Sequence, residues 1–585
     1  MKVSPPIHHQ TILRTITERA RWESSFVADI SVFAGILAIL YALIVSGRIW
    51  FAPFTPVAHI SSSPRALPLY AAYSVVRIAI AYALSLLFAL AYGFAAAKSE
   101  RAARVLLPLL DILQSIPVLS FLPGVMVAMV ALFPQRQLGL ELGSVLLIFT
   151  GQAWNIAFSF YASLKAIPRE LDEAARLYRF GAWQRLVELE LPYAAIGLIW
   201  NSMMSVASGW FFLMACEMFV LGARDFRLPG LGSYLQIAAS SGDMRDIAWG
   251  MAAMIAVIVL LDQLVWRPVI AWADKFTFET VEGAAAPASL ALMVLRHSGI
   301  VAALYRVAIH PLGERLTKAF ARKTAVGLQT PPRGANWRKA LMRVAAGAVL
   351  AVLGWFTLRA IVTLTQIEPG DFTVLARDAA RTFLRVNAAL ALGALWAVPV
   401  GVWIGTSPRV VRIAQPLVQI AASVPATALF PVVLLALIRA GGGMGLAALA
   451  LMLLGTQWYI LFNVIAGAMA IPTDLKEAAT VFRFNRRERW RRLILPAIFP
   501  YLVTGMVTAS GGAWNASIVA EYFHFQGRTL SARGLGATIS RATDTGNFPL
   551  LLAATLVMSI IVVTVNRVLW QRLYRLAATR YKLES

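Results

Sequence analysis

The chain has 585 residues and a net charge of +24; 59% of its residues are hydrophobic and only 14% are charged. Soluble domains carry about 25% charged residues, so this composition excludes a soluble globular protein and predicts a polytopic membrane protein. The positive charge would also suit a nucleic-acid binder. However, the basic residues cluster where apolar runs stop, as in the cytoplasmic loops of membrane proteins. We therefore expect a lipid bilayer, and no nucleic acid, as partner.

Apolar runs of about 20 residues, the length that crosses a bilayer as a helix, recur along the whole chain. The basic N-terminal tail precedes a first run that no convincing cleavage site follows, so we expect a retained helix and not a cleaved signal peptide. Prolines in the third helix of each half predict a break or kink. The expected fold is all-α and polytopic, with about twelve transmembrane helices at 27–47, 71–97, 105–133, 141–163, 193–222, 247–271, 342–363, 378–403, 410–438, 445–468, 497–522 and 548–571.

The two halves of the chain repeat one another. Trp154 aligns with Trp458 at an offset of 304 residues, and the motif GLG occurs at 230–232 and again at 534–536. Upstream the offset is 308, so a four-residue length difference falls within 124–150. Repeats in the same order predict two parallel six-helix units related by a pseudo-twofold axis along the membrane normal.

Basic residues predict the orientation of these helices. The stretch 267–343, after the sixth helix, holds twelve basic and four acidic residues, so we expect it in the cytoplasm together with both termini. Within it, 285–311 is apolar enough to suggest an extra span. Arg296, His297 and Arg306 favour instead an amphipathic helix at the membrane interface.

A short amphipathic segment, LDEAARLYRFGAWQRLVELELP at 171–192, returns as LKEAATVFRFNRRERWRRLILP at 475–496. Apolar and small residues at i, i+3, i+4 and i+7 predict one helical face, with two alanines at its centre turned outward for close approach of another protein. Gly181 and its counterpart Asn485 are expected in the left-handed conformation that ends a first helix. Each copy should form helix, sharp turn and helix, and the repetition favours a docking surface over a solvated loop.

The repeated segment resembles the EAA loop of bacterial ABC importer permeases. It carries Glu-Ala-Ala, then a glycine, then Leu-Pro, with Asn485 in place of the glycine in the second copy. SVVR at 74–77, the GLG motif and LLDQLVWRP at 260–268 further resemble permeases of the nitrate/sulfonate/bicarbonate (NitT/TauT) type. The resemblance covers about 70–273 and 378–575. Two permease units fused in one chain depart from the usual two separate copies.

This resemblance implies the type I ABC importer transmembrane fold in the bacterial inner (cytoplasmic) membrane. The implied division is an N-terminal tail and first helix (1–69), a first permease unit (70–273), a basic cytoplasmic linker (274–341), the first helix of the second half (342–377), a second permease unit (378–575) and a C-terminal tail (576–585).

The resemblance also implies partners. Each EAA loop would act as a coupling helix on one of two ATP-binding cassette subunits, and a periplasmic substrate-binding protein would deliver the solute. The chain has no G-x-x-x-x-G-K-[ST] phosphate loop, so ATP and Mg should be bound by the partner subunits and not by this chain, which we expect to be no enzyme. The implied coupling residues are Glu173, Ala174, Ala175, Gly181, Glu477, Ala478, Ala479 and Asn485.

Candidate pathway residues lie in the equivalent fifth helices of the two halves. Glu217 and Glu521 are charges within spans, which are costly and often functional, although snorkelling to the periplasmic interface is an equal alternative. Trp210 and Trp514 lie beside glycines that serve either tight packing or a pathway wall.

Two further pairs of equivalent residues bear on the pathway. Asn515 aligns with Phe211, so the two walls of a pore would differ, which suits an asymmetric small organic solute. Arg77 and Arg385 lie near the periplasmic starts of the second helices, where anchoring of the side chain at the membrane interface is favoured over contact with the solute.

The predicted function is the permease of an ATP-driven importer for a small solute, an anion such as a sulfonate, nitrate, bicarbonate or an organic acid. The alternative is an ion-coupled secondary transporter with internal repeats, in which Glu217 and Glu521 would be ion sites. Such a transporter does not need two docking loops. No convergent nucleophile, base or metal-ligand set indicates an enzyme or a metal site, and the lone Cys216 is interpreted as a packing residue.

Overall fold

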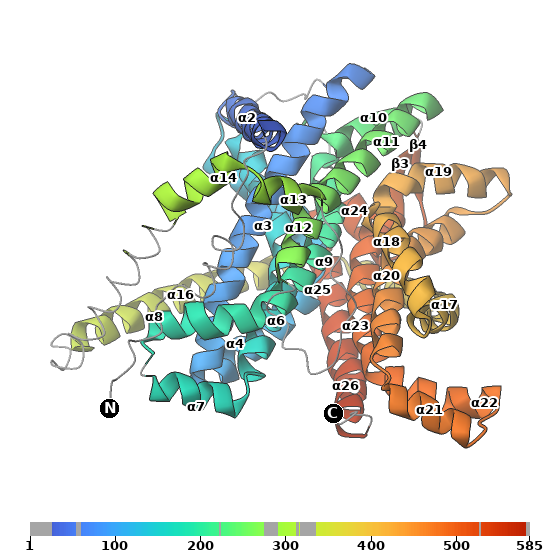
Figure 1. Cartoon of the computed structure of the whole chain (residues 1–585). Coiled ribbons are helices and arrows are strands. Elements are labelled where there is room, and N and C mark those ends of the chain that lie inside the picture. The colour runs from blue at the N-terminus through green and yellow to red at the C-terminus, as the bar shows by residue number, and fades with distance from the viewer. Residues whose placement is uncertain are drawn as a thin grey trace, which may run out of the picture. The chain divides into compact units, whose positions relative to one another are not determined.

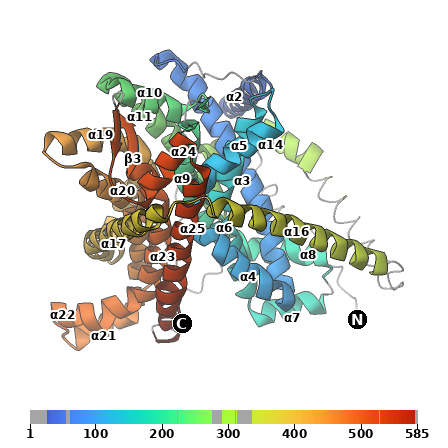
Figure 2. The same cartoon turned by 180° about the vertical axis from the view of Figure 1, so that it is seen from behind.

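The computed structural model describes residues 26–53, 60–178, 180–221, 224–273, 290–309, 311, 315, 335–525 and 528–580. They form helices joined by short loops, with two small antiparallel hairpins (Figures 1 and 2). The chain divides into two compact units. The smaller unit comprises Met1–Val45, Ser163–Trp200 and Leu260–Gly334, and the larger unit comprises Ser46–Ala162, Asn201–Val259 and Ala335–Ser585.

The larger unit holds most of the first repeat. Its elements are a 3₁₀ turn (Pro64–Ala66), α3 (Leu67–Lys98), α4 (Glu100–Ser115), the 3₁₀ turn η2 (Val118–Phe121), α5 (Leu122–Leu132), α6 (Leu138–Lys165), α9 (Leu191–Glu217), β1 (Val220–Leu221), β2 (Arg224–Asp225), α10 (Leu231–Ser241) and α11 (Met244–Leu261). The ends of α6 and α11 and the start of α9 belong to the smaller unit.

The second repeat lies entirely within the larger unit. Its elements are α16 (Ala335–Leu364), α17 (Pro369–Gly405), α18 (Pro408–Ser423), α19 (Ala426–Arg439), α20 (Met444–Met469), α21 (Thr473–Val481), α22 (Arg486–Glu488), the π-helical turn η7 (Arg489–Ile494), α23 (Leu495–Ala520), β3 (Tyr522–Phe525), β4 (Arg528–Ser531), α24 (Leu535–Thr545), α25 (Phe548–Val565), the π-helical turn η8 (Asn566–Trp570) and α26 (Gln571–Arg580).

The smaller unit holds most of α2 (Phe26–Trp50) and the first copy of the repeated segment. Its other elements are α7 (Arg169–Leu177), α8 (Ala182–Arg185), the π-helical turns η3 (Leu186–Glu190) and η4 (Asp262–Trp266), α12 (Arg267–Ala273), α13 (Leu290–Arg296), α14 (Gly299–Leu304) and η6 (Tyr305–Ile309). The short helices within 290–309 are interrupted at His297 and Ser298, so these residues form no continuous span. Asp29 caps α14, accepting hydrogen bonds from Ser298 Oγ at 2.7 Å and from the Ile300 N–H at 3.1 Å.

Among the described residues, nine helices are long and apolar enough to cross a membrane, or ten if one bent pair counts as a span. They confirm a multi-pass, all-α membrane fold. The bent pair is α4 with η2 and α5, which meet at 80° before Pro117. Its counterpart breaks at Val424 between α18 and α19. Both breaks confirm the proline-based prediction for the third helices. Of the twelve spans expected, the other two coincide with α16 and with α18–α19.

Glycines let neighbouring helices of each repeat approach closely. A Cβ placed on Gly93 of α3 would lie 2.9 Å from the Phe160 ring of α6, and one on Gly401 of α17 would lie 2.8 Å from Val464 of α20. Gly93 and Gly401 are equivalent at the offset of 308. Small residues at such crossings favour packing of membrane helices, because the backbones can come together. The two repeats therefore use the same contact to join their second and fourth helices.

Within the second repeat, two specialised regions lie at opposite ends of the bundle. In both views α21 and α22 lie beyond one end of α20 and α23, whereas β3 and α24 lie at the other end (Figures 1 and 2). The repeated amphipathic segment is thus separated by the length of the helices from the GLG motif, which opens α24.

Candidate functional site

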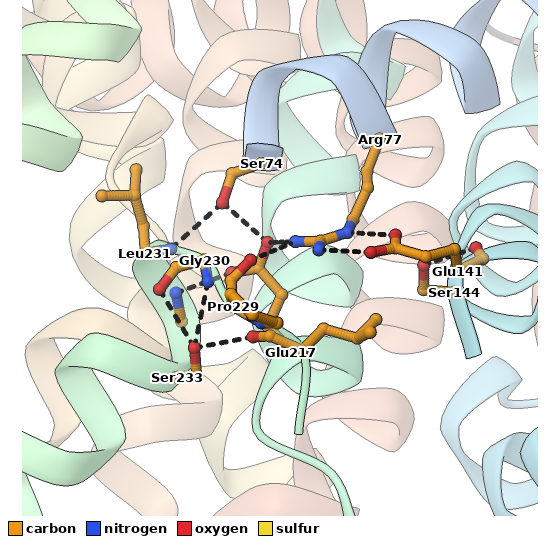
Figure 3. Close-up of polar contacts among 11 residues, drawn as sticks. Ser74, Arg77, Glu141, Ser144, Glu217, Pro229, Gly230, Leu231 and Ser233 are labelled. Atoms are coloured by element: carbon orange, nitrogen blue, oxygen red, sulfur yellow. Dashed lines mark hydrogen bonds and ion pairs between the residues drawn. The ribbon is translucent and has the colours of Figure 1, made fainter. Parts of the chain in front are cut away.

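A buried cluster of charges joins four helices of the first repeat (Figure 3). Arg77 of α3 lies between two carboxylates and is 1% exposed. Its Nε and Nη2 donate to Glu141 of α6 at 2.6 and 2.7 Å, and its Nη1 donates to Glu217 of α9 at 2.8 Å. Nη1 also donates to the Pro229 carbonyl at 2.8 Å. A buried charge is tolerated only when it is paired and hydrogen-bonded, and Arg77 meets that condition on both edges of its guanidinium.

Glu217 is held by three kinds of donor. Besides Arg77, the Ser74 hydroxyl donates to Oε1 at 2.6 Å and the Gly232 N–H donates to Oε2 at 2.7 Å. A Cβ placed on Gly230 would lie 2.3 Å from the carboxyl carbon of Glu217, which is far inside van der Waals contact. The first glycine of the GLG motif is therefore needed because the carboxylate lies against the backbone.

The second repeat builds the same cluster with one member missing. Glu521 accepts from Arg385 Nη1 at 2.7 Å, from the Thr382 hydroxyl at 2.9 Å and from the Gly536 N–H at 2.9 Å. A Cβ on Gly534 would lie 2.2 Å from Glu521 Oε2. The counterpart of Glu141, by contrast, is Gly445 (141 + 304), so Arg385 keeps only one carboxylate.

This cluster corrects two expectations. Glu217 and Glu521 are each 0% exposed, so the proposed snorkelling to the interface is wrong. Arg77 is buried, so its anchoring at the interface is wrong as well. The reason is the same in both cases: the arginine of the second helix and the glutamate of the fifth neutralise one another inside the bundle.

The repeated segment forms helix, turn and helix in both copies, but the turn differs from the one expected. Gly181 and Asn485 have φ of −65° and −69° with extended ψ, so the predicted left-handed conformation is wrong. Both residues are instead the N-cap of the second helix. Asn485 Oδ1 accepts from the Glu488 N–H at 2.8 Å, and Glu488 accepts in return from the Asn485 N–H at 3.1 Å. Asn is a stronger N-cap than Gly, which accounts for the departure from glycine.

Among the described non-glycine residues, Arg483 has a positive φ, of 49°. Its counterpart Arg179 lies outside the described residues. The chain therefore reverses two residues before the N-cap of the second helix, and the sequence has no glycine or asparagine there to mark the position.

The outward face predicted for the segment is confirmed where it ends, at Tyr178 and Phe482, and is wrong at its second alanine. Ala175 and Ala479 are each 5% exposed and pack inward. The residues that stand out at the end of the first helix are larger, namely Leu177 and Tyr178 in the first copy and Val481 and Phe482 in the second. The glutamates Glu173 and Glu477 are exposed, whereas Ala174 and Ala478 are half-buried. The second alanine of each copy is thus turned inward, while apolar side chains face outward beside a glutamate.

The two copies differ in their internal ion pairs. Asp172 and Glu190 both pair with Arg185 in the first copy, the Glu190 contact being 2.9 Å. Their counterparts in the second copy are Lys476 and Ile494, which cannot accept from an arginine. The first copy is therefore cross-linked by charge, whereas the second has the reciprocal Asn485–Glu488 cap and one longer ion pair, Glu488 with Arg492 at 4.0 Å.

A cavity of about 140 Å³ in the larger unit, the central cavity, is lined by both repeats. Its polar groups include Gln114, Asn155, Ser208, Thr508 and Asn515, and none of its described lining residues is charged. Its aromatic walls are Trp154, Phe212, Tyr459 and Trp570. The cavity thus offers neutral hydrogen-bonding groups between aromatic rings.

The turn η2 separates the central cavity from a second cavity of about 150 Å³, the hairpin cavity, which reaches β1 and β3. Val118 lines the first and Leu119 the second. The Leu119 N–H donates to Asn515 Oδ1 at 3.4 Å, a bond between the repeats. In the hairpin cavity, the Tyr522 hydroxyl donates to Asp544 at 2.7 Å, and burial together with this hydrogen bond raises the pKa of Tyr522 to about 12.

The family model of binding-protein-dependent transport system inner membrane components matches residues 64–265 and again 397–582. The chain belongs to this family. It carries the family unit twice, which confirms the predicted ABC permease with two fused units. The family is one of transport components and not of enzymes.

Three relatives support the NitT/TauT type. The nitrate import permease protein NrtB of Leptolyngbya laminosa is 29% identical over 142 residues, which is 24% of this chain and 50% of NrtB. The bicarbonate transport system permease protein CmpB of Synechocystis is 30% identical over 137 residues, 23% of this chain and 48% of CmpB. The taurine transport system permease protein TauC of Escherichia coli is 26% identical over 201 residues, 34% of this chain and 69% of TauC. This chain spans about half the length of NrtB and CmpB.

The five pathway candidates fall into two groups by their positions in the structure. Asn515 lines the central cavity. Trp210 and Trp514 are buried in helix packing, and Glu217 and Glu521 are buried in the charge clusters. Cys216 is also buried, in line with its interpretation as a packing residue. Sequence reasoning missed Glu141 and most of the cavity lining. Glu141 could have been noticed, because it is a lone acidic residue in an apolar run. Its partner Arg77, however, lies 64 positions away in the sequence.

Proposed function

We propose that this permease forms the complete transmembrane pathway of an ATP-driven importer for a small anion, of the class that includes sulfonates, nitrate, bicarbonate and organic acids. The observation that carries the proposal is the doubled helix–turn–helix segment. Both copies expose a glutamate and a pair of apolar residues at the same positions, Leu177 with Tyr178 and Val481 with Phe482. Exposed apolar side chains at the same place in two repeats suit two identical docking partners.

The partners would be two ATP-binding cassette subunits, each of which binds ATP and Mg and receives one loop. Glu173, Ala174, Ala175 and Gly181 would form one coupling site. Glu477, Ala478, Ala479 and Asn485 would form the other. A periplasmic substrate-binding protein would deliver the solute at the opposite side of the inner membrane, where the hairpins and GLG motifs would then lie. Both termini and the 274–341 linker would be cytoplasmic, between permease units at 70–273 and 378–575, as the positive-inside rule favours.

The central cavity is the best candidate for the solute site. Neutral amides and hydroxyls can hydrogen-bond to an anion without trapping it as a fixed cation would, which suits a site that must also release its solute. Asn515 lines this cavity and accepts a hydrogen bond from Leu119 of η2, which lines the hairpin cavity. Phe211 at the equivalent position of the first repeat cannot make such a bond.

Binding of the ATPase is the first test. The detergent-solubilised permease should retain its ATP-binding subunits in a pull-down, and Glu173→Arg with Glu477→Arg should abolish their recovery. Tyr178→Ala with Phe482→Ala should do the same, because it removes the exposed apolar pair. Tyr574→Ala, which truncates an exposed aromatic residue on α26, is the matched control and should retain the subunits. Equal recovery from all variants would contradict the assignment of the loops.

The pathway can be tested by thiol labelling, because the single native cysteine is buried. Ser208 lines the central cavity, whereas Ser205, one turn earlier on α9, is 0% exposed. Ser208→Cys should react with a small maleimide, and candidate solutes should protect it. Ser205→Cys should stay unreactive. Equal labelling of both positions would remove the central cavity from the pathway.

An ion-coupled secondary transporter remains the second candidate function, with Glu217 and Glu521 as its ion sites. The contacts argue against it. An ion site needs carboxylate oxygens that can be protonated or can ligate a cation, but each of these carboxylates already accepts from an arginine, a hydroxyl and a backbone N–H. Solute uptake that persists in vesicles without nucleotide and follows an ion gradient would favour this candidate.

A further inference from the structure

The guanidinium groups of Arg77 and Arg385 occupy equivalent positions but have unequal partners. Each donates through Nη1 to the glutamate of its fifth helix. Arg77 also uses its other edge, where Nε and Nη2 donate to the two oxygens of Glu141. Neither Nε nor Nη2 of Arg385 donates to any residue that the structure describes. One edge of Arg385 is therefore open.

Gly445 is what opens this edge. A Cβ placed on Gly445 would lie 4.0 Å from Nη2 of Arg385, and no other described atom lies within that distance. The backbone of α20 thus points this position at the guanidinium but supplies no side chain. The Arg385 side chain is 20% exposed, against 1% for Arg77, so its open edge can be reached from the surface.

The charges around Arg385 leave room for a second anion. Glu521 does not depend on Arg385 alone, because Thr382 and the Gly536 N–H also donate to it. Asp378, two turns earlier on α17, already accepts from Arg381 and from Thr538, both at 2.9 Å. The first repeat shows that the same guanidinium can hold two carboxylates at once, one on each edge.

We propose that the open edge of Arg385 binds an oxyanion in the position that the Glu141 carboxylate takes on Arg77. Two parallel N–H groups match two oxygens of a phosphate, sulfate or carboxylate, which is the bidentate geometry that arginine favours. The anion is either the phosphate of an acidic lipid or a soluble oxyanion. The site is distinct from the central cavity, whose described lining includes neither Arg385 nor Gly445.

Two arms of one experiment distinguish these sources. In neutral detergent, the thermal unfolding midpoint is followed while phosphate or sulfate replaces chloride at constant ionic strength. In the second arm, the unfolding midpoint is measured for the permease in nanodiscs of phosphatidylcholine and in nanodiscs that also contain phosphatidylglycerol. The lipids that stay bound are counted by native mass spectrometry. The wild type should respond saturably in at least one arm. A response to free ions identifies a soluble oxyanion, and a response in the lipid arm alone identifies a lipid phosphate.

Gly445→Glu is the decisive variant, because it supplies the missing carboxylate. It should raise the unfolding midpoint without added anion and weaken the anion response at least roughly tenfold. Gly443→Glu, the same change two residues earlier with open space around it, should keep the response. Arg385→Lys keeps a cation for Glu521 but loses the planar edge, so it should also weaken the response and serves if Gly445→Glu does not fold. A wild type that responds in neither arm, or a Gly445→Glu response equal to that of the wild type, overturns the site.

Discussion

The two repeats of this permease share a frame but distribute charge differently. In the first repeat, Arg77 is sealed between Glu141 and Glu217. In the second, Arg385 pairs with Glu521 alone. The repeated helix–turn–helix segments follow the same trend, since Asp172, Arg185 and Glu190 cross-link the first copy and have no equivalent network in the second. Fusion in one chain lets two copies of a unit diverge in this way, because each position is encoded twice and a homodimer must change both together.

Some contacts of the charge cluster occur in both repeats, and one occurs only in the first. The arginine, the fifth-helix glutamate and the GLG glycine occur in both repeats with the same contacts. They tie the second helix to the fifth and to the short helix after the hairpin. The additional tie to the fourth helix through Glu141 is present once. We therefore expect the first repeat to be the more rigid at this end and the second to be the more adaptable.

The largest effect should come from removing the arginines. Arg77→Met leaves two buried carboxylates without a cation and should cost about 3–5 kcal/mol of stability. Arg385→Met leaves one carboxylate, which still has a hydroxyl and a backbone donor, and should cost about 1–3 kcal/mol. Thermal unfolding of the purified proteins should rank them in that order. The reverse order would show that the second repeat, and not the first, carries the tighter cluster.

Substituting the first glycine of either GLG motif should cost the permease about the same stability. Gly230→Ala and Gly534→Ala each force a methyl group against a buried carboxylate, so both should destabilise the permease by about 1–3 kcal/mol. Gly124→Ala in α5, where a Cβ meets nothing within 4 Å, is the control and should be near neutral. Unequal losses at 230 and 534 in unfolding experiments would mean that the two clusters are not built alike.

Much of this architecture could be predicted from the sequence, because it follows from local patterns. Apolar length gives the spans, prolines give the broken third helices, and the offset of 304 residues gives the repeats. The partners of buried charges could not be predicted, because Arg77 reaches Glu217 across 140 positions and no periodicity links them. The burial of Ala175 and Ala479 was missed for a related reason: a small residue packs inward or outward depending on neighbouring residues that the pattern does not specify.

The N-cap of the second loop offers a smaller test. Asn485→Ala removes the acceptor for the Glu488 N–H and should cost the loop about 1 kcal/mol. Hydrogen exchange of the amides at the start of α22 should accelerate accordingly, while exchange in α8 of the first loop should not change. Unchanged exchange at α22 would show that the cap does not hold the second loop.

The smallest effect is expected when the N-cap residues of the two loops are exchanged. Asn485→Gly gives the second loop the residue of the first and should lower its local stability by a few tenths of a kcal/mol, less than the alanine variant, because glycine is itself an acceptable N-cap. Gly181→Asn should raise the stability of the first loop by a similar amount, since the extended backbone at 181 accepts any residue. Exchange rates that shift in opposite directions would confirm that cap strength is interchangeable between the copies. If only the second loop responds, the ion pairs of Arg185 already fix the first loop, and the difference between the repeats lies in their charges and not in their caps.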